Sequence, residues 1–372
     1  MGVIRLENLK PGMVTSAPVL TQRGQQIIDK NVVLTKQLIA RMQFYGITVA
    51  SIVDINDKAT QKRKAIPTET TDKPVVPEID LSYSQKIRKS SSFQKFQIDY
   101  TNHVSNFNNY LRDFKETQVL HFAKELTDIP KTLIAETRTS IAFFDMIHNL
   151  RSIDDSIYAH SLNVAMISRM LGKWLKLDEE QLDTLTLAAA LHDVGKFLIP
   201  DEVLNKQGKL TDEEFDLIKQ HPVLGYDFLK SQDINYHVKQ AALMHHERCD
   251  GSGYPLGLTS NEIDNFAQVI AIADVYDAMT AARKYRAPLC PFQVIAEFEK
   301  DGLSKYNPKF ILTFLQHIAN AYQNNRVLLN DGRSAKIILL NQNHLSKPMI
   351  QLSDGSCLDL AREPELYIQS VV

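Results

Sequence analysis

The spacing of apolar residues changes twice along the chain of 372 residues. Residues 1–55 carry short apolar runs of β type around a single helical stretch. Across residues 131–325, most blocks repeat their apolar side chains three or four positions apart, which is the spacing of helices. From 326 to 372 the pattern returns to short strands separated by Asp-Gly turns. The pattern predicts a mainly α protein, in which a helical bundle lies between a small β-rich N-terminal module and C-terminal β-hairpin strands.

Two segments of different composition connect the N-terminal module to the bundle. Residues 56–90 are a predicted linker, because their first part is rich in Lys and Thr and is interrupted by Pro67, Pro74 and Pro77. Residues 91–130 carry an apolar stripe at helical spacing and predict an amphipathic helix. This helix is either a spacer or an arm through which two copies form a homodimer, and the sequence leaves both open. The individual strands are expected at 13–20, 26–28, 47–53, 334–340, 349–352 and 366–371, and one N-terminal helix at 35–44.

Charge and cysteine content narrow the class of protein. The 42 basic and 44 acidic residues nearly cancel, so the chain has no overall field that would hold a long nucleic acid or an anionic membrane. The cysteines, Cys249, Cys290 and Cys357, form no CxxC pair, which argues against a disulfide framework and a thiolate metal site. No apolar run has the length of a membrane span or the position of a signal peptide. We therefore expect a cytoplasmic protein without membrane insertion.

Histidine and aspartate residues gather on the predicted inner faces of the helices. In four helices the apolar stripe continues into His160, His192, His245 or Asp274. A lone histidine on such a face is more often a core residue than a ligand. An unpaired buried carboxylate is costly, however, and a shared metal centre accounts for all of these groups at once. Nitrogen and oxygen ligands without sulfur suit divalent Fe, Mn, Zn or Co. The candidate ligands are His160, His192, Asp193, His221, His245, His246 and Asp274.

A glycine-rich loop follows the paired histidines. Residues 245–255 read HHERCDGSGYP, and Gly251 and Gly253 would let the backbone approach a ligand closely. A purely structural turn explains these glycines and Tyr254 equally well.

Two arginines, Arg283 and Arg286, follow the predicted helix of Asp274. Guanidinium groups bind phosphate in bidentate fashion, although a charged run at the end of a helix is usually solvated. Their position after a helix that presents a candidate ligand favours a phosphate-binding role.

These motifs together resemble the HD-GYP phosphodiesterases of bacterial cyclic di-GMP signalling, a branch of the HD hydrolase superfamily. The resemblance extends from about Ile157 to His317, and its motifs stand in the family's order. They read HSLNVAMIS, LHDVGKFLIPDEVLNKQGKLTDEE, HPVLGYDFL, HHERCDGSGYP and IADVYDAMTAARKYR. An HD pair alone would be a weak signal, whereas the full set is highly specific.

The resemblance implies two divalent transition-metal ions, with Fe or Mn favoured and Zn, Co or Ni as alternatives. It implies one ion held by His160, His192, Asp193 and Asp274, and another held by Asp193, His221, His245 and His246. Asp193 would bridge the two ions. Lys196 would contact the scissile phosphate or the leaving oxygen, and Arg283 and Arg286 would hold the nucleotide phosphates. Gly251, Gly253, Tyr254 and Pro255 would line the substrate cleft.

The implied reaction is attack of a metal-bridging hydroxide on cyclic di-GMP, which opens it to the linear dinucleotide pGpG. Some members of the family carry a Glu that helps to hold a third metal, four residues before the first histidine ligand. The present chain has Ser156 there, so we expect a binuclear centre and leave hydrolysis onward to GMP open. Two alternatives are the same hydrolase acting on another cyclic dinucleotide and a catalytically silent dinucleotide sensor. Since every ligand of the two-metal set is present, the sequence favours the enzyme.

Overall fold

The structure is a computed structural model. It describes residues 2–10, 12–20, 26–30, 32–35, 38–39, 42, 47–53, 83–137, 139–150, 156–204, 206, 208–281 and 289–372. The chain divides into two compact units, Met1–Leu81 and Ser82–Val372, and each is described by itself.

The N-terminal unit contains two small antiparallel sheets. β1 (Gly2–Arg5) pairs with β4 (Val49–Ile52), and β2 (Val19–Leu20) pairs with β3 (Gln26–Ile28). A short 3-10 helix, η1 (Leu6–Asn8), follows β1. The β-rich N-terminal module is thereby confirmed. Its core is formed by Leu9, Val19, Ile27, Ile28, Leu34, Met42, Ile47, Ala50 and Ile52.

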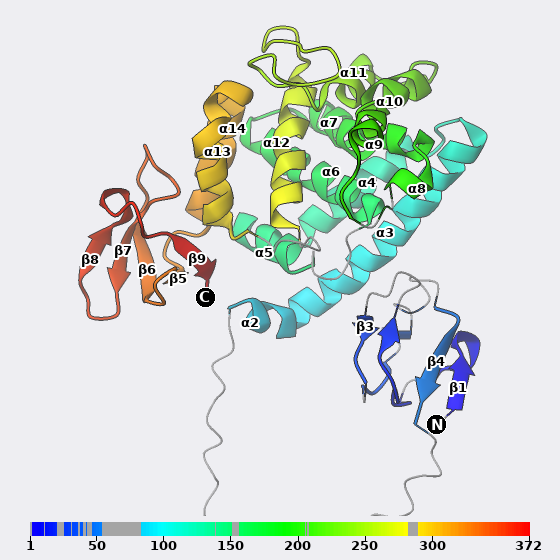
Figure 1. The fold of residues 1–372 in the computed structure, drawn as a ribbon, viewed down its shortest axis with the longest axis horizontal. Helices are drawn as coiled ribbons and strands as arrows, with labels where there is room; N and C mark the ends of the chain where they lie inside the picture. The colour runs from blue at the N-terminus through cyan, green and yellow to red at the C-terminus, as the bar shows by residue number, and fades with distance from the viewer. Residues whose placement is uncertain are drawn as a thin grey trace, which may run out of the picture. The chain divides into compact units, whose positions relative to one another are not determined.

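The second unit is dominated by helices, as Figure 1 shows. In the middle of this body, α6 packs against α7, α12 and α4, and α11 packs against α7, α10 and α12. α6 is buried almost along its whole length, because its residues are small or apolar on nearly every face. The helices are α2 (Tyr83–Lys89), α3 (Ser91–Thr117), α4 (Ala123–Ala135), α5 (Ser140–Leu150), α6 (Ile157–Trp174), α7 (Glu179–Leu191), η3 (Val194–Leu198), α8 (Asp201–Leu204), α9 (Asp212–Ile218), α10 (His221–Leu229), α11 (Tyr236–Met244), α12 (Asn265–Thr280), α13 (Pro291–Lys305) and α14 (Pro308–Ala321). None of the described helices is long and apolar enough to span a bilayer.

The amphipathic helix expected in residues 91–130 is α3. It packs its apolar stripe against α4, α5 and α6 of the same unit. Tyr100 is buried within this stripe, and its hydroxyl donates to Asn163 Oδ1 at 2.8 Å, while the side chain of Ile98 is exposed. The dimerising role of this helix stays a prediction.

The C-terminal strands form one antiparallel sheet of five strands in the order β8-β7-β6-β5-β9. The C-terminal strands are therefore confirmed, although the sequence pattern missed the first strand and the fourth. The sheet contacts α13 through β9, and Cys290 Sγ lies 3.3 Å from the carbonyl oxygen of Ile368. The strands are β5 (Arg326–Leu329), β6 (Ser334–Leu339), β7 (Met349–Leu352), β8 (Cys357–Asp359) and β9 (Ile368–Val371), with a 3-10 helix η4 (Leu360–Arg362) after β8.

Candidate metal centre

The helical fold brings all seven candidate ligands together. Most of them lie at helix ends: His192 and His245 follow the last residues of α7 and α11, and His221 begins α10. His160 and Asp274 project from within α6 and α12. The ligand atoms form two groups, and within each group all of them lie within 4.8 Å of one another. One group is Asp193, His221, His245 and His246, and the other is His160, His192 and Asp274.

Asp193 lies between the two groups. Its Oδ2 is 3.5 Å from His160 Nε2 and 3.4 Å from His192 Nε2. Its Oδ1 is 3.2 Å from His221 Nε2 and 3.6 Å from His245 Nε2. Each oxygen of this one carboxylate therefore faces a different group of imidazoles.

Backbone carbonyls orient three of the histidine rings. Nδ1 of His192 donates to Ala189 O at 2.7 Å, and Nδ1 of His221 donates to Ile218 O at 2.7 Å. Nδ1 of His245 lies 3.1 Å from the carbonyl oxygen of Ala241. A carbonyl oxygen can only accept, so the Nδ1 atoms carry the protons. In the neutral form of each ring, the Nε2 lone pair is consequently directed toward Asp193 and is available to a metal.

The unsatisfied atoms at the centre fit a bound cation. Among the described residues, the buried atoms His192 Nε2 and Asp193 Oδ1 have no hydrogen-bond partner. Nε2 of His221 and Nε2 of His245 lie only 3.2 Å apart. Buried acceptors without donors are costly. Divalent cations would satisfy these lone pairs, and the donor set of imidazoles and carboxylates is that of a divalent metal site.

The protonation states agree with metal binding. Burial lowers the pKa of His192 to about 3 and also lowers the pKa of His221. Although burial opposes ionisation of Asp193, the charge of Lys196 holds the pKa of that carboxyl well below its usual value. Burial likewise opposes ionisation of Asp274, but its hydrogen bond with His160 keeps its pKa well below the usual value. Neutral imidazoles and ionised carboxylates are the forms that bind metals.

His160 differs from the other rings because two carboxyl groups flank it. Its Nε2 is 3.2 Å from Asp274 Oδ1, and its Nδ1 is 2.8 Å from Asp277 Oδ2. Burial alone would lower the pKa of His160, but the hydrogen bonds to these two groups raise it to about 10. Sequence reasoning missed Asp277. Its signal was its position three residues after Asp274, which places both carboxyl groups on one face of α12.

Gly195 allows α10 to approach His192 and Asp193 closely. A Cβ atom at this position would lie 1.9 Å from His221 O and 2.5 Å from Gly225 N. The backbone of η3 therefore touches the start of α10, which places His221 beside Asp193. Lys196 follows, and its Nζ donates to Asp193 Oδ2 at 2.5 Å while its side chain stays 23% exposed. Lys196 thus lies between the metal centre and solvent.

The glycine-rich loop folds back onto the paired histidines. Tyr254 stacks on His246 with ring centroids 4.7 Å apart and planes inclined by 23°. Glu247, which is buried, accepts backbone hydrogen bonds from Leu256 at 2.7 Å and Leu258 at 3.0 Å. A Cβ at Gly253 would lie 2.4 Å from the Cα of Glu247, so the loop and the histidine segment are in backbone contact.

Not every predicted substrate residue can be placed. Tyr254, which stacks on His246, and Pro255 are partly buried, while Arg283 and Arg286 lie outside the described residues. Glu247, like Asp277, was missed by sequence reasoning. Its signal was its place directly after the two histidines, within the loop motif itself.

The fold and the clustered side chains define a helical protein with a candidate site for divalent metal ions. The sequence profile described as "HD domain" matches residues 123–310, which is half of the chain. The chain therefore belongs to the HD domain family.

Curated relatives of known name agree with this family. Over 205 residues the chain is 33% identical to a cyclic di-GMP phosphodiesterase of Pseudomonas aeruginosa. The aligned region covers 55% of this chain and 49% of that protein. Over 189 residues it is 35% identical to a cyclic di-GMP phosphodiesterase of Thermotoga maritima, covering 49% and 51% respectively. A 3'3'-cGAMP-specific phosphodiesterase of Vibrio cholerae is 41% identical over 132 residues, or 36% of this chain and 31% of that one. The resemblance to HD-GYP phosphodiesterases is thereby confirmed. The chain spans about a third to a half of the length of these relatives.

A solved structure supports the fold. An HDG"Y"P protein from Bdellovibrio bacteriovorus superposes with a TM-score of 0.50 at 16% identity, covering 85% of this chain and 97% of that one. At this level of identity, the likeness concerns the fold alone.

Proposed function

We propose that this protein hydrolyses cyclic di-GMP to the linear dinucleotide pGpG at a centre of two divalent metal ions. The observation that carries the proposal is the position of Asp193, whose two oxygens face two separate groups of ligands. A shared carboxylate between two ions is suited to in-line displacement at phosphorus, where the attacking and leaving oxygens are stabilised together. The similarity to named cyclic di-GMP phosphodiesterases supports the choice of substrate.

The ligand assignment follows the two groups in the structure. His160, His192 and Asp274 would hold one ion, and His221, His245 and His246 the other, with Asp193 shared by both. When bound, the ions supply Lewis acidity and lower the pKa of a water molecule that serves as the nucleophile. The mixed set of imidazoles and carboxylates suits Fe or Mn, and Zn, Co and Ni remain alternatives.

Lys196 is the proposed contact to the scissile phosphate. In the structure its ammonium group pairs with Asp193 at the partly exposed side of the centre. With cations sharing the charge of Asp193, the ammonium group of Lys196 would be available to a phosphate oxygen. The Tyr254 and Pro255 side of the loop would line the cleft. Arg283 and Arg286 would hold the remaining phosphate, and this role stays a prediction.

Ser156 supports a binuclear rather than a trinuclear centre. Its hydroxyl accepts the backbone N–H of Ala159 at 3.2 Å and so caps α6. A serine in this capping role supplies no carboxylate for a third ion. We therefore propose pGpG as the product, and GMP formation is left open.

A second candidate substrate is 3'3'-cGAMP, because a relative named for that substrate matches at 41% identity. Chromatography of the products formed from equal amounts of cyclic di-GMP and 3'3'-cGAMP tests the choice. We expect faster turnover of cyclic di-GMP, and preferential turnover of 3'3'-cGAMP would reverse the assignment. The same assay tests the silent-sensor alternative, because a sensor would bind the dinucleotide without releasing a linear product. The cytoplasmic location and the homodimer stay predictions.

A further inference from the structure

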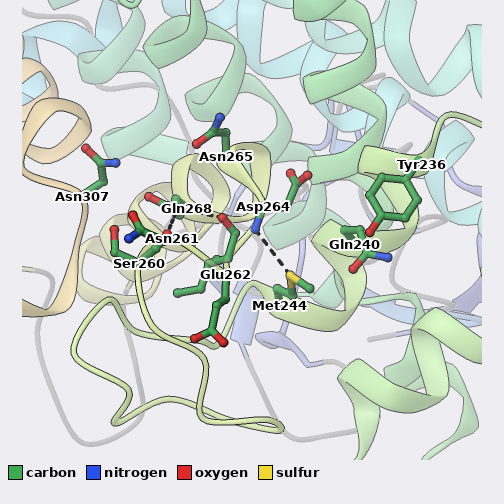
Figure 2. Close-up of a pocket in the computed structure, with 11 residues that line it drawn as sticks. Tyr236, Gln240, Met244, Ser260, Asn261, Glu262, Asp264, Asn265, Gln268 and Asn307 are labelled. Carbon is green, nitrogen blue, oxygen red and sulfur yellow. Dashed lines mark hydrogen bonds between the residues drawn. The ribbon is translucent and has the colours of Figure 1, made fainter.

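A polar cavity of about 400 Å³, shown in Figure 2, is lined by residues of α11, α12 and the segment before α12, and by none of the candidate metal ligands. Its carboxylates are already engaged. Asp264 Oδ1 accepts from Phe266 N at 2.8 Å, and Asp264 Oδ2 lies 2.5 Å from Nδ1 of His237. Glu262 Oε2 accepts from Thr259 N at 2.9 Å. Aromatic side chains close to the metal centre are better placed to contact a nucleobase.

An aromatic pair joins the two elements that carry His160 and Lys196. Tyr158, on α6, stacks on Phe197, in η3, with ring centroids 5.8 Å apart and planes inclined by 27°. Tyr158 comes two residues before His160, and Phe197 directly follows Lys196, whose ammonium group pairs with Asp193. Both aromatic residues are partly exposed. Nucleobases stack on exposed aromatic rings of this kind.

Two opposite charges act on the hydroxyl end of this pair. Burial raises the pKa of Tyr158, the charge of Arg112 opposes this rise, and the charge of Asp201 adds to it. Both charged side chains are therefore near the hydroxyl, although they come from α3 and α8. Both are exposed, and neither forms an ion pair or a side-chain hydrogen bond with another described residue. An unpaired guanidinium and an unpaired carboxylate thus accompany one aromatic pair.

The aromatic pair also stands close to the proposed phosphate contact. Phe197 and Lys196 are consecutive residues, and consecutive Cα atoms are about 3.8 Å apart. In a nucleotide the base is joined to its phosphate through the sugar, so the two groups need separate but neighbouring contacts. A nucleotide whose phosphate is held at Lys196 could therefore place its base on the ring of Phe197.

Guanine fits this combination of groups. Its O6 and N7 atoms accept hydrogen bonds and are read in bidentate fashion by arginine. Its N1–H and N2–H groups donate and suit a carboxylate, which only accepts. Adenine has an amino group in place of O6 and an acceptor in place of N1–H, so the same two side chains would not satisfy it.

We propose that Tyr158 and Phe197 form a stacking platform for one guanine of the substrate, with Arg112 and Asp201 at the edge of the base. This inference rests on the proposed function, because it assigns the base subsite of the same reaction. It adds a residue of α3, outside the motifs around the metal centre, to the groups that select the substrate.

Steady-state kinetics of the full chain loaded with Mn²⁺ test the proposal, together with calorimetric binding of cyclic di-GMP and cyclic di-AMP. Phe197→Leu removes the ring but keeps an apolar side chain. Its matched control is Phe122→Leu, because Phe122 also stacks on a tyrosine, Tyr110, with centroids 4.7 Å apart and planes inclined by 26°. Asp201→Asn removes a charge and adds an amide donor, and its control is Asp212→Asn in the first turn of α9.

We expect Phe197→Leu to weaken the binding of cyclic di-GMP and to raise its KM roughly tenfold, because the base loses a stacking partner. Asp201→Asn should lower the preference for cyclic di-GMP over cyclic di-AMP roughly tenfold in kcat/KM. Both controls should match the unchanged chain. If Phe197→Leu fails to fold, Asp201→Asn decides, since Asp201 is exposed and its substitution removes no packing.

Unchanged affinity for cyclic di-GMP in folded Phe197→Leu, or unchanged base preference in Asp201→Asn, would overturn the subsite and leave the proposed hydrolysis intact. Loss of bound metal from Phe197→Leu would also overturn it, since the ring would then support the metal centre. Binding of cyclic di-GMP without hydrolysis, weakened in Phe197→Leu, would support the subsite and reject the hydrolase. If the unchanged chain neither binds nor hydrolyses cyclic di-GMP, both proposals fail.

Discussion

His160 and Asp277 are in direct contact at the metal centre, with Nδ1 and Oδ2 2.8 Å apart. His160 is a candidate ligand, whereas Asp277 is not. Asp277 thereby fixes the orientation of the His160 ring, and it leaves Nε2 directed at Asp274 and Asp193. Partners of this kind raise the basicity of a ligand and hold its ring in place.

Asp277→Asn should weaken metal binding by about 10 to 100-fold, the usual effect of losing such a partner. Asparagine keeps the size of the side chain but removes its charge. The measurement is metal affinity from competition with a chelator. The matched control is Asp128→Asn on the exposed side of α4. Unchanged affinity in Asp277→Asn would show that the contact does not support the ligand.

Metal binding should release a proton from His160. Because the pKa of His160 is raised to about 10 in the metal-free protein, this ring is protonated at neutral pH. A metal can bind Nε2 only after that proton leaves, so affinity should rise with pH up to the region of this pKa and fall at lower pH. Calorimetry in buffers of different ionisation enthalpy should report close to one proton released from this ring. A binding enthalpy independent of the buffer would contradict the prediction.

Gly195→Ala should disrupt the contact between η3 and α10. The added Cβ would meet His221 O and Gly225 N, which are backbone atoms that cannot move aside separately. We expect a loss of more than about 3 kcal/mol in the free energy of unfolding and reduced metal content.

Gly172→Ala is the comparison for Gly195→Ala, because its Cβ would meet the ends of the Leu182 and Leu185 side chains at 2.8 and 2.9 Å. These ends can shift, so the effect should be clearly smaller. Chemical denaturation of both variants measures the difference. Equal stability of the two would show that the backbone contact at Gly195 does not matter.

Glu247→Gln should loosen the glycine-rich loop. The carboxylate accepts from the backbone N–H groups of Leu256 and Leu258 through different oxygens, whereas a glutamine offers one acceptor oxygen. The expected loss is about 1 kcal/mol in the free energy of unfolding, since one partly buried backbone N–H loses its acceptor.

The matched control for Glu247→Gln is Glu213→Gln, on the exposed surface of α9. Denaturation midpoints and the rate of proteolytic cleavage in residues 248–258 are the measurements for both variants. If the loop of Glu247→Gln is cleaved no faster than in the control, Glu247 does not hold the loop.

The sequence predicted the clustering of the candidate ligands better than the residues that orient them. His160, His192 and Asp274 could be predicted as candidate ligands because each lies in line with an apolar helix stripe. This pattern can be read from the amino-acid sequence alone. Asp277 and Glu247 could not be assigned this way. Asp277 forms a hydrogen bond with the ring of His160 on another helix. Glu247 accepts hydrogen bonds from backbone N–H groups nine and eleven residues away.

The fold was predicted where periodicity is strong. The helical body and its flanking strands follow from the apolar pattern, whereas β5 and β8 are short strands whose pairing depends on the neighbouring strands. In α3, Ile98 is exposed whereas Tyr100 is buried, because the tyrosine hydroxyl is satisfied by Asn163. Such a partner cannot be read from the spacing of apolar residues.

The account depends most on Asp193 as the carboxylate shared by two ions. Elemental analysis of purified protein, alongside hydrolysis of cyclic di-GMP by the same sample, tests this directly in the unchanged chain and in Asp193→Ala. We expect two metal ions per chain in the former, and in Asp193→Ala the loss of both the bound metal and the formation of pGpG, with helical content preserved. Full metal content or sustained turnover in folded Asp193→Ala would contradict the account.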